Sequence, residues 1–250
     1  MRNDNLDELA LPLDERNLAH VLSGVALAVL TSRHPEAHTS ACTCWWRERD
    51  FVLKTVLTQA DLFDVAYEFC SRLRWIPGMG AAVQGAFVAG SELGSNPFIS
   101  LAGDGQKKAR RRGSIGTSAF KTFSGQLAPA KDLLDKQRAA LAASSSGDPW
   151  LFQTSRGIAS WGFDCRVGSH AYDLGFSSND EGSGDRDPIY TAIELLSIAA
   201  ASFFAAVQGW QSDEDTVRYS VWTQPISLSL VPYAVAGRLE GPPARRYSLT

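Results

Sequence analysis

The sequence lacks the short motifs that mark nucleotide-binding loops and common hydrolytic sites. Neither Gly-Lys-Ser nor Gly-Lys-Thr occurs, so the signature of a phosphate-binding P-loop is missing. Gly78 and Gly80 have no third glycine at the spacing of a dinucleotide-binding fingerprint, and neither G-x-S-x-G nor H-E-x-x-H is found. These absences argue against the enzyme classes that the motifs define, and we expect a non-catalytic protein without a cofactor.

Cysteine is scarce and no C-x-x-C pair occurs. Cys42 and Cys44 lie two apart in an expected strand, so their side chains should point to the same face. One C-x-C pair alone is weak evidence for zinc, and we expect no metal site. Reduced, buried thiols of a cytoplasmic protein are the better interpretation of the four cysteines, which are Cys42, Cys44, Cys70 and Cys165.

One arrangement keeps an enzyme open as an alternative. Cys165, His170 and Asp173 are close in sequence and have the residue types of a thiol–imidazole–carboxylate group. Such groups are assembled in space, and many sequences offer these residues by chance. An acidic segment follows without the spacing of a calcium-binding loop, and we interpret it as a solvated loop carrying Asp180, Glu181, Asp185 and Asp187.

Long apolar runs are also missing. The first ten residues are acidic and have no apolar core of a secretory signal. The longest mostly apolar stretch, residues 189–207, contains Glu194, so it predicts a buried core helix and no membrane partner. The 250 residues with 44% hydrophobic side chains suit one cytoplasmic domain over residues 1–250, with a mobile basic loop at about residues 103–118.

Periodicity and turn residues predict the elements of the first half. Residues 9–13 suit a short edge strand because Pro12 cannot donate to a sheet, and Asp14 should cap a helix over about residues 18–31. Gly24 within that helix suggests close packing. Residues 39–47 and 51–56 suit a hairpin that turns at Arg49 and Asp50. Thr58 and Asp61 resemble a capping box of a helix that ends near residue 75.

The second half mixes strands and helices without a regular alternation. We expect a strand at residues 97–102 and a helix at residues 127–143, with Lys131, Lys136 and Arg138 on its polar side. Short strands are expected within residues 150–176, a long helix from about Pro188, two strands within residues 217–235 and a frayed tail after Gly237. This order favours an α+β fold with a mixed antiparallel sheet and several packed helices.

The strongest feature is an uneven distribution of charge. The net charge is −3, but residues 101–140 hold nine basic and three acidic residues, so this stretch carries +6 and the rest −9. Such a basic stretch gains affinity for a phosphate backbone by releasing counterions. A solvated surface loop is the plainer alternative. We favour nucleic-acid contacts by the densest part, which contains Lys107, Lys108, Arg110, Arg111 and Arg112.

Two adjacent tryptophans, Trp45 and Trp46, fall in the expected hairpin. Neighbouring residues of a strand face opposite sides, so one should lie in the core and the other at the surface. Aromatic residues at a surface often anchor a partner. We therefore consider this pair a candidate partner interface, with packing in the core as the alternative.

Several short stretches resemble, in their order, a CRISPR-associated subunit of the type I-U (I-G) effector (Cascade) complex, a small protein of the large-subunit kind. They are residues 11–30, LPLDERNLAHVLSGVALAVL, then KTFSGQ at 121–126, YDLGFS at 172–177 and Glu194-Leu195-Leu196. The resemblance implies a subunit that binds other CRISPR effector subunits, guide RNA and target DNA, including the motif that flanks the target. It also implies that a separate helicase-nuclease cleaves the DNA.

Within KTFSGQ, Lys121 and Gln126 are candidates for base contacts. Lysine can pair with guanine edges and glutamine with adenine edges. The alternative is a turn at Ser124-Gly125, which Gln126 merely caps.

Overall fold

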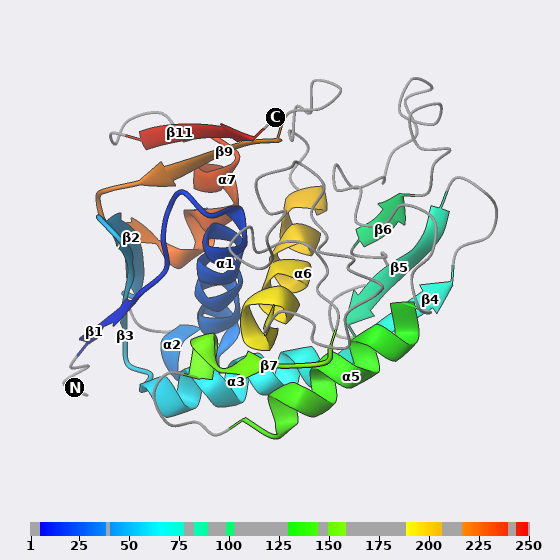
Figure 1. Ribbon diagram of the computed structural model, residues 1–250. Coiled ribbons are helices and arrows are strands. Elements are labelled where there is room, and N and C mark those ends of the chain that lie inside the picture. Colours follow the sequence, from blue (N-terminus) through cyan, green and yellow to red (C-terminus); the bar gives the residue numbers. More distant parts are fainter. Residues whose placement is uncertain are drawn as a thin grey trace.

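The computed structural model describes residues 6–38, 41–77, 83–89, 99–102, 130–144, 150–158, 189–206, 217–239 and 244–249. These parts form an α+β fold, as predicted (Figure 1). Two long helices stand at the centre, with an antiparallel sheet on one side and two further helices crossing below them in the view of Figure 1.

The main sheet is antiparallel, in the order β1-β3-β2-β10. Its strands are β1 (Asp7–Leu11), β3 (Asp50–Thr55), β2 (Thr43–Arg47) and β10 (Ile226–Ser227). β1 lies at the edge, as predicted, but it begins and ends two residues earlier than the expected residues 9–13, so Pro12 follows the strand. Because Arg47 pairs with Asp50, the hairpin turns at Glu48 and Arg49, one residue earlier than expected. Glu48 occupies the left-handed region there, with φ of 56°.

The central pair consists of α1 (Leu18–Arg33) and α6 (Thr191–Ala206). Every residue from Leu18 to Thr31 is buried, and α6 is buried from Thr191 to Ala200. The helix predicted at about residues 18–31 and the buried core helix predicted at residues 189–207 are both confirmed. The helices are linked by Ser197, whose hydroxyl donates to the Ala19 carbonyl at 3.1 Å. Gly24 faces the ring of Phe51 in β3, where an added Cβ would lie 3.1 Å from Cγ.

The cap of α1 differs from the prediction. Asn17, not Asp14, precedes the helix, and its side chain accepts a hydrogen bond from the Ala19 amide. The Asp14 amide instead donates to His20 Nδ1 at 2.8 Å, and the Asp14 carboxylate binds Arg16. Asp14 therefore organises the turn before the helix, because its polar groups are already used there.

The two crossing helices are α3 (Gln59–Arg72) and α5 (Ala130–Ala142). The predicted capping box of α3 is confirmed: the Asp61 amide donates to Thr58 Oγ1, and the Thr58 amide donates to Asp61. α3 ends at Arg72, earlier than predicted, because residues from Leu73 onward form a strand.

That strand, β4 (Leu73–Pro77), starts a second antiparallel sheet of order β4-β5-β6. β5 (Val83–Ala89) was not expected, whereas β6 (Ile99–Ala102) falls within the strand predicted at residues 97–102. Of the expected strands after residue 150, β7 (Thr154–Ser155) is present and pairs with β8 (Ile189–Tyr190). It follows the short 3-10 helix η2 (Trp150–Phe152).

The C-terminal part needs two corrections. β9 (Val217–Trp222) forms as predicted, but β10 has only two residues and η3 (Leu228–Leu230) and α7 (Val231–Val235) follow it. The tail does not fray, since β11 (Ala244–Leu249) pairs with β9 along six residues. α2 (Pro35–His38) completes the elements named here. Among the residues described, no helix is both long and apolar enough for a bilayer.

Candidate functional site

Most residues predicted to bind nucleic acid lie outside the described part of the chain. These are Lys107, Lys108, Arg110, Arg111, Arg112, Lys121 and Gln126. Cys165, His170 and Asp173 of the alternative thiol site lie outside it too, as does the acidic segment of residues 179–187. All of these assignments stay predictions. The structure places only the last part of the basic stretch, which forms α5.

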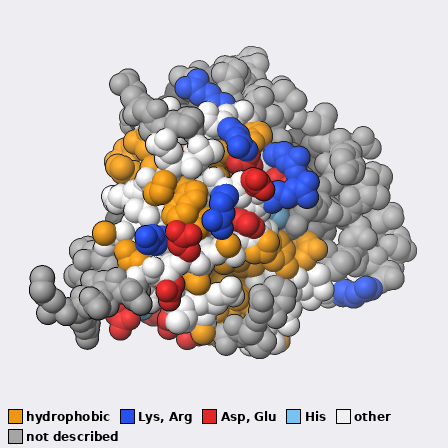
Figure 2. All heavy atoms as spheres, turned by 90° about the vertical axis from the view of Figure 1, so that its left-hand side faces the viewer, with side chains coloured by type: hydrophobic (Ala, Val, Ile, Leu, Met, Phe, Trp, Pro, Cys, Tyr) orange, Lys and Arg blue, Asp and Glu red, His pale blue; other side chains and the backbone are white. Residues whose placement is uncertain are grey.

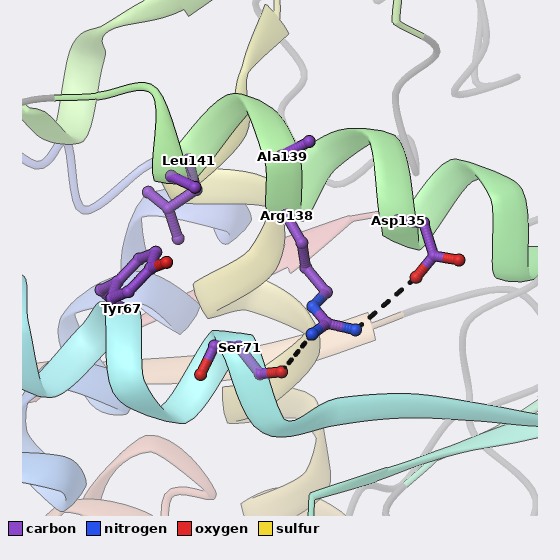
Figure 3. A pocket seen from close by; sticks show the side chains of 7 residues that line it. Tyr67, Ser71, Asp135, Arg138, Ala139 and Leu141 are labelled. Carbon is purple, nitrogen blue, oxygen red and sulfur yellow. Dashed lines mark hydrogen bonds and ion pairs between the residues drawn. The ribbon is translucent and has the colours of Figure 1, made fainter.

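Two basic residues of α5 differ in their surroundings. Lys136 is exposed, as predicted. Arg138 is half-buried, because its guanidinium reaches across to the last turn of α3 (Figure 3). Nη1 donates to the Leu73 carbonyl at 3.3 Å, Nη2 donates to the Ser71 carbonyl, and Asp135 forms an ion pair at 3.6 Å. Arg138 therefore ties α5 to α3 by binding carbonyls that a helix end leaves without partners.

A hollow of about 290 Å³ lies beside Arg138. Tyr67 and Ser71 of α3 line one side, and the α5 side is lined by Asp135, Arg138, Ala139, Leu141 and Ala142 (Figure 3). Tyr67 is 38% exposed and stacks on Phe63 with ring centroids 6.0 Å apart. Asp135 and two carbonyls already engage the guanidinium of Arg138, so the hollow presents little net positive charge to an anion.

A second polar site joins the two ends of the described chain. Glu15, in the turn between β1 and α1, has a side chain only 4% exposed. Its Oε1 accepts hydrogen bonds from Arg245 and, at 2.8 Å, from the Tyr247 hydroxyl, both of β11. The Tyr219 hydroxyl of β9 donates to the Glu15 backbone carbonyl, and the rings of Tyr219 and Tyr247 stack. We call Glu15, Arg245 and Tyr247 the Glu15 clamp.

The charges around the Glu15 clamp shift several pKa values. The hydrogen bond to Glu15 raises the pKa of Arg245. Burial raises the pKa of Tyr247, and its bond to Glu15 adds to that effect. The hydrogen bond from Arg16 lowers the pKa of Asp14, and the same bond raises the pKa of Arg16. The shifts of Asp14, Arg16 and Arg245 favour their charged forms at neutral pH, whereas that of Tyr247 favours its neutral hydroxyl, which can donate to Glu15.

Sequence reasoning missed this second site. The C-terminal tail, which carries Arg245 and Tyr247, was expected to fray. The buried ring of His20 also belongs here: its Nδ1 accepts from the Asp14 amide, so its proton must be on Nε2 when the ring is neutral. A signal for the site was absent because its parts are 230 residues apart.

The tryptophan pair divides as a strand requires. Trp46 is 1% exposed and packs against Phe51, so it belongs to the core of this chain. Trp45 is partly buried, packed against the same core from its other side, and remains the candidate for a partner contact.

Three of the four cysteines are described, and all three are buried, as predicted. Burial raises the pKa of the Cys70 thiol to about 12 and raises that of Cys44 as well. A thiol must lose its proton to act as a nucleophile. Cys44 and Cys70 therefore offer no reactive thiolate at neutral pH.

Comparisons with protein-family models, with curated proteins and with solved structures find no match to this chain.

Proposed function

We propose that the chain is a non-catalytic subunit of an RNA-guided CRISPR effector complex and contacts target DNA or guide RNA. The observation that carries the proposal is the charge distribution, +6 in residues 101–140 and −9 elsewhere. The order of the motifs that resemble the type I-U (I-G) subunit suggests the type of complex to which the chain would belong. Contact with the motif flanking the target is part of the proposal, and cleavage is assigned to a separate protein.

The proposal is supported by the described residues at the two ends of the basic stretch, residues 101–140, which we also call the basic segment. Residues 103–129 connect β6 to α5, and Arg138 fastens α5 to the end of α3. Lys136 is exposed on α5, so the described end of the basic stretch offers a cation to a ligand. Arg138, by contrast, directs both Nη groups to partners within the protein.

The first prediction concerns the densest basic part. Replacing Lys107, Lys108, Arg110, Arg111 and Arg112 with serine should weaken binding of a fluorescein-labelled 30-nucleotide DNA or RNA. Each lost phosphate contact removes counterion release, so the slope of log K against log salt should fall by about 0.7–0.9 per contact. Fluorescence anisotropy at several salt concentrations measures both quantities.

A matched control removes the same charge elsewhere. The exposed residues Arg47, Arg49, Arg74, Arg238 and Arg246 are also changed to serine, which lowers the net charge equally. The proposal requires a larger loss in the first variant than in this control. Equal affinity and slope in the first variant and the wild type would remove the basic segment from the mechanism.

A protein-only scaffold is the second candidate function. Leu230 and Tyr233, 41% and 48% exposed, are large apolar side chains at the surface of η3 and α7, and Trp45 is only partly buried. Surfaces of this kind bind proteins. A pull-down of the tagged protein from its native cells separates the two functions. Recovery of a complex with a short RNA supports the effector subunit, whereas recovery of protein partners free of nucleic acid supports the scaffold.

A further inference from the structure

Two arginines from distant parts of the chain lie beside the Glu15 clamp. Arg16 belongs to the turn between β1 and α1, directly after Glu15. Arg245 belongs to β11, which pairs with β9 at the C-terminal end of the described chain. Glu15, the residue directly before Arg16, accepts a hydrogen bond from Arg245, so Arg16 adjoins a residue of the clamp. Arg16 and the clamp therefore lie close together.

Carboxylates hold both guanidinium groups in place. Arg16 donates from Nε and Nη2 to the two oxygens of Asp14, at 3.1 and 3.0 Å, and its amide donates to Oδ1 at 2.9 Å. Arg245 donates from Nη1 to Glu15, whose carboxylate is buried. Much of the rotamer freedom of the two side chains is therefore lost before any ligand arrives, which lowers the entropic cost of binding.

Both guanidinium groups nevertheless face solvent. Their side chains are 60% and 54% exposed. Arg16 binds Asp14 through Nε and Nη2, and Arg245 binds Glu15 through Nη1 and also bonds the Tyr247 side chain. Each arginine thus uses one edge to bind a carboxylate and keeps further N–H donors for an external acceptor.

The balance of charge indicates which ligand suits this pair. Asp14 and Glu15 offset Arg16 and Arg245, and the exposed Arg246 adds one positive charge. The local field is weak, so a ligand must be recognised mainly by directed hydrogen bonds. A phosphate group suits this because its oxygens accept from several N–H groups at once and its charge strengthens each bond.

We infer that Arg16 and Arg245 form a second contact point for a phosphate of the nucleic-acid backbone, separate from the basic segment. This inference rests on the proposed function, because the ligand is the same nucleic acid. The carboxylates beneath act as positioning groups, and the contact fixes orientation without reading sequence.

A purely structural role would make a different prediction. If the two arginines only fasten the C-terminal strand to the N-terminal turn, their replacement changes stability and leaves the affinity for nucleic acid unchanged. Arg16 separates the two roles well, because it binds the neighbouring, half-buried Asp14, and its replacement keeps every residue of the Glu15 clamp.

The test compares Arg16→Gln with Arg47→Gln in the full chain. Arg47 is a matched control, since its side chain is 53% exposed and it pairs with Glu8 at 3.9 Å, but no carboxylate holds it in two bonds. The pair of Arg47 and Glu8 links β2 and β1, and basic and acidic side chains lie side by side on this face of the molecule (Figure 2). The probe is the labelled 30-nucleotide DNA or RNA.

Arg16→Gln should lower the affinity about threefold to tenfold. The slope of log K against log salt should fall by about 0.7–0.9, the value for one phosphate contact. Arg47→Gln should change the affinity by no more than about twofold and leave the salt slope unaltered, because an isolated surface charge is largely screened by salt. Arg245→Lys keeps a cation for Glu15 but loses the planar fork, so affinity should fall while the melting curve by circular dichroism stays close to that of the wild type.

Arginine footprinting supplies a second readout. Phenylglyoxal modification followed by mass spectrometry should show Arg16 protected by the nucleic acid and Arg47 modified equally with and without it. If the basic-segment variant loses binding while Arg16→Gln binds normally and Arg16 is not protected, the inference is overturned and the proposed function stands. If the wild type binds no nucleic acid and Arg16 cross-links to an acidic protein, both are overturned.

Discussion

At Gly24 a buried helix meets the main sheet with no room for a side chain. An added Cβ would lie 3.1 to 3.3 Å from three carbons of the Phe51 ring, closer than ordinary contact. Phe51 is fully buried, and Trp46 packs against it, so the ring cannot move without disturbing the core. The glycine predicted from the sequence to permit close packing does so here.

Gly24→Ala should therefore destabilise the protein by about 1–3 kcal/mol, the usual cost of overpacking. Alanine forms helices better than glycine, by about 1 kcal/mol, so an effect of propensity alone would have the opposite sign. Urea unfolding followed by tryptophan fluorescence measures the change. Phe51→Leu serves as the control: in that background Gly24→Ala should cost clearly less, and an unchanged cost would refute the steric explanation.

At the scale of elements, α3 shows how much a local signal can determine. Thr58 and Asp61 are three residues apart, and both reciprocal bonds of the capping box form. The hydrogen bond from the Thr58 side chain, followed by that from its amide, lowers the pKa of Asp61 below the ordinary 3.8. A carboxylate with a lowered pKa stabilises the folded state above its unfolded pKa, and this stabilisation is lost as pH falls through the folded pKa.

Thr58→Ala should lower the free energy of unfolding at pH 7 by about 1 kcal/mol, the usual value of an N-cap. Because the Asp61 pKa then returns toward 3.8, the decrease in stability on acidification below about pH 4 should become shallower. Urea unfolding between pH 7 and pH 3 measures both effects. In an Asp61→Asn background, Thr58→Ala should leave the pH dependence unaltered; a change there would assign it to another group.

α5 shows the opposite case among the elements. Its helical pattern was predicted correctly, but the contacts that half-bury Arg138 against α3 were not foreseen. Helical periodicity distinguishes faces only by polarity, and a long arginine can bury its stem while its head finds polar partners. The carbonyls of Ser71 and Leu73 are available because α3 ends there. The sequence pattern of α5 holds no information about where α3 ends.

At the scale of the whole molecule, the Glu15 clamp fastens the C-terminal strand to the N-terminal turn. Glu15 is buried and accepts from two side chains of β11, while β11 otherwise pairs only with β9 among the described strands. A buried carboxylate that loses its partners costs several kcal/mol, so the clamp and the strand depend on each other.

Glu15→Gln should destabilise the protein by about 1–3 kcal/mol although the two side chains have nearly the same shape, because charge-assisted bonds become neutral ones. Glu8→Gln is the matched control. Glu8 is exposed and pairs with Arg47 at 3.9 Å, so its replacement should cost less than about 0.5 kcal/mol. Urea unfolding measures the free energy of unfolding of both variants. Equal losses would show that the clamp adds no more stability than a surface ion pair.

The sequence by itself determined the features that depend on neighbours along the chain. These are the α3 cap, the hairpin to within one residue, the helix α1, the buried core helix α6, and the burial of Cys42, Cys44 and Cys70. Each follows from local hydrogen bonding, turn chemistry or apolar content. The charge of the basic segment is likewise a property of the sequence, and its role stays a prediction.

Only the tertiary structure determined the hydrogen-bond partners of polar groups whose partners are distant in the sequence. Asn17 caps α1 while Asp14 binds His20 and Arg16, and the half-buried Arg138 binds carbonyls that the end of α3 offers. The tail forms β11 because β9 and Glu15 bind it. A polar group adopts the arrangement that satisfies it when buried, and which partners are near is settled by the packing of the whole chain.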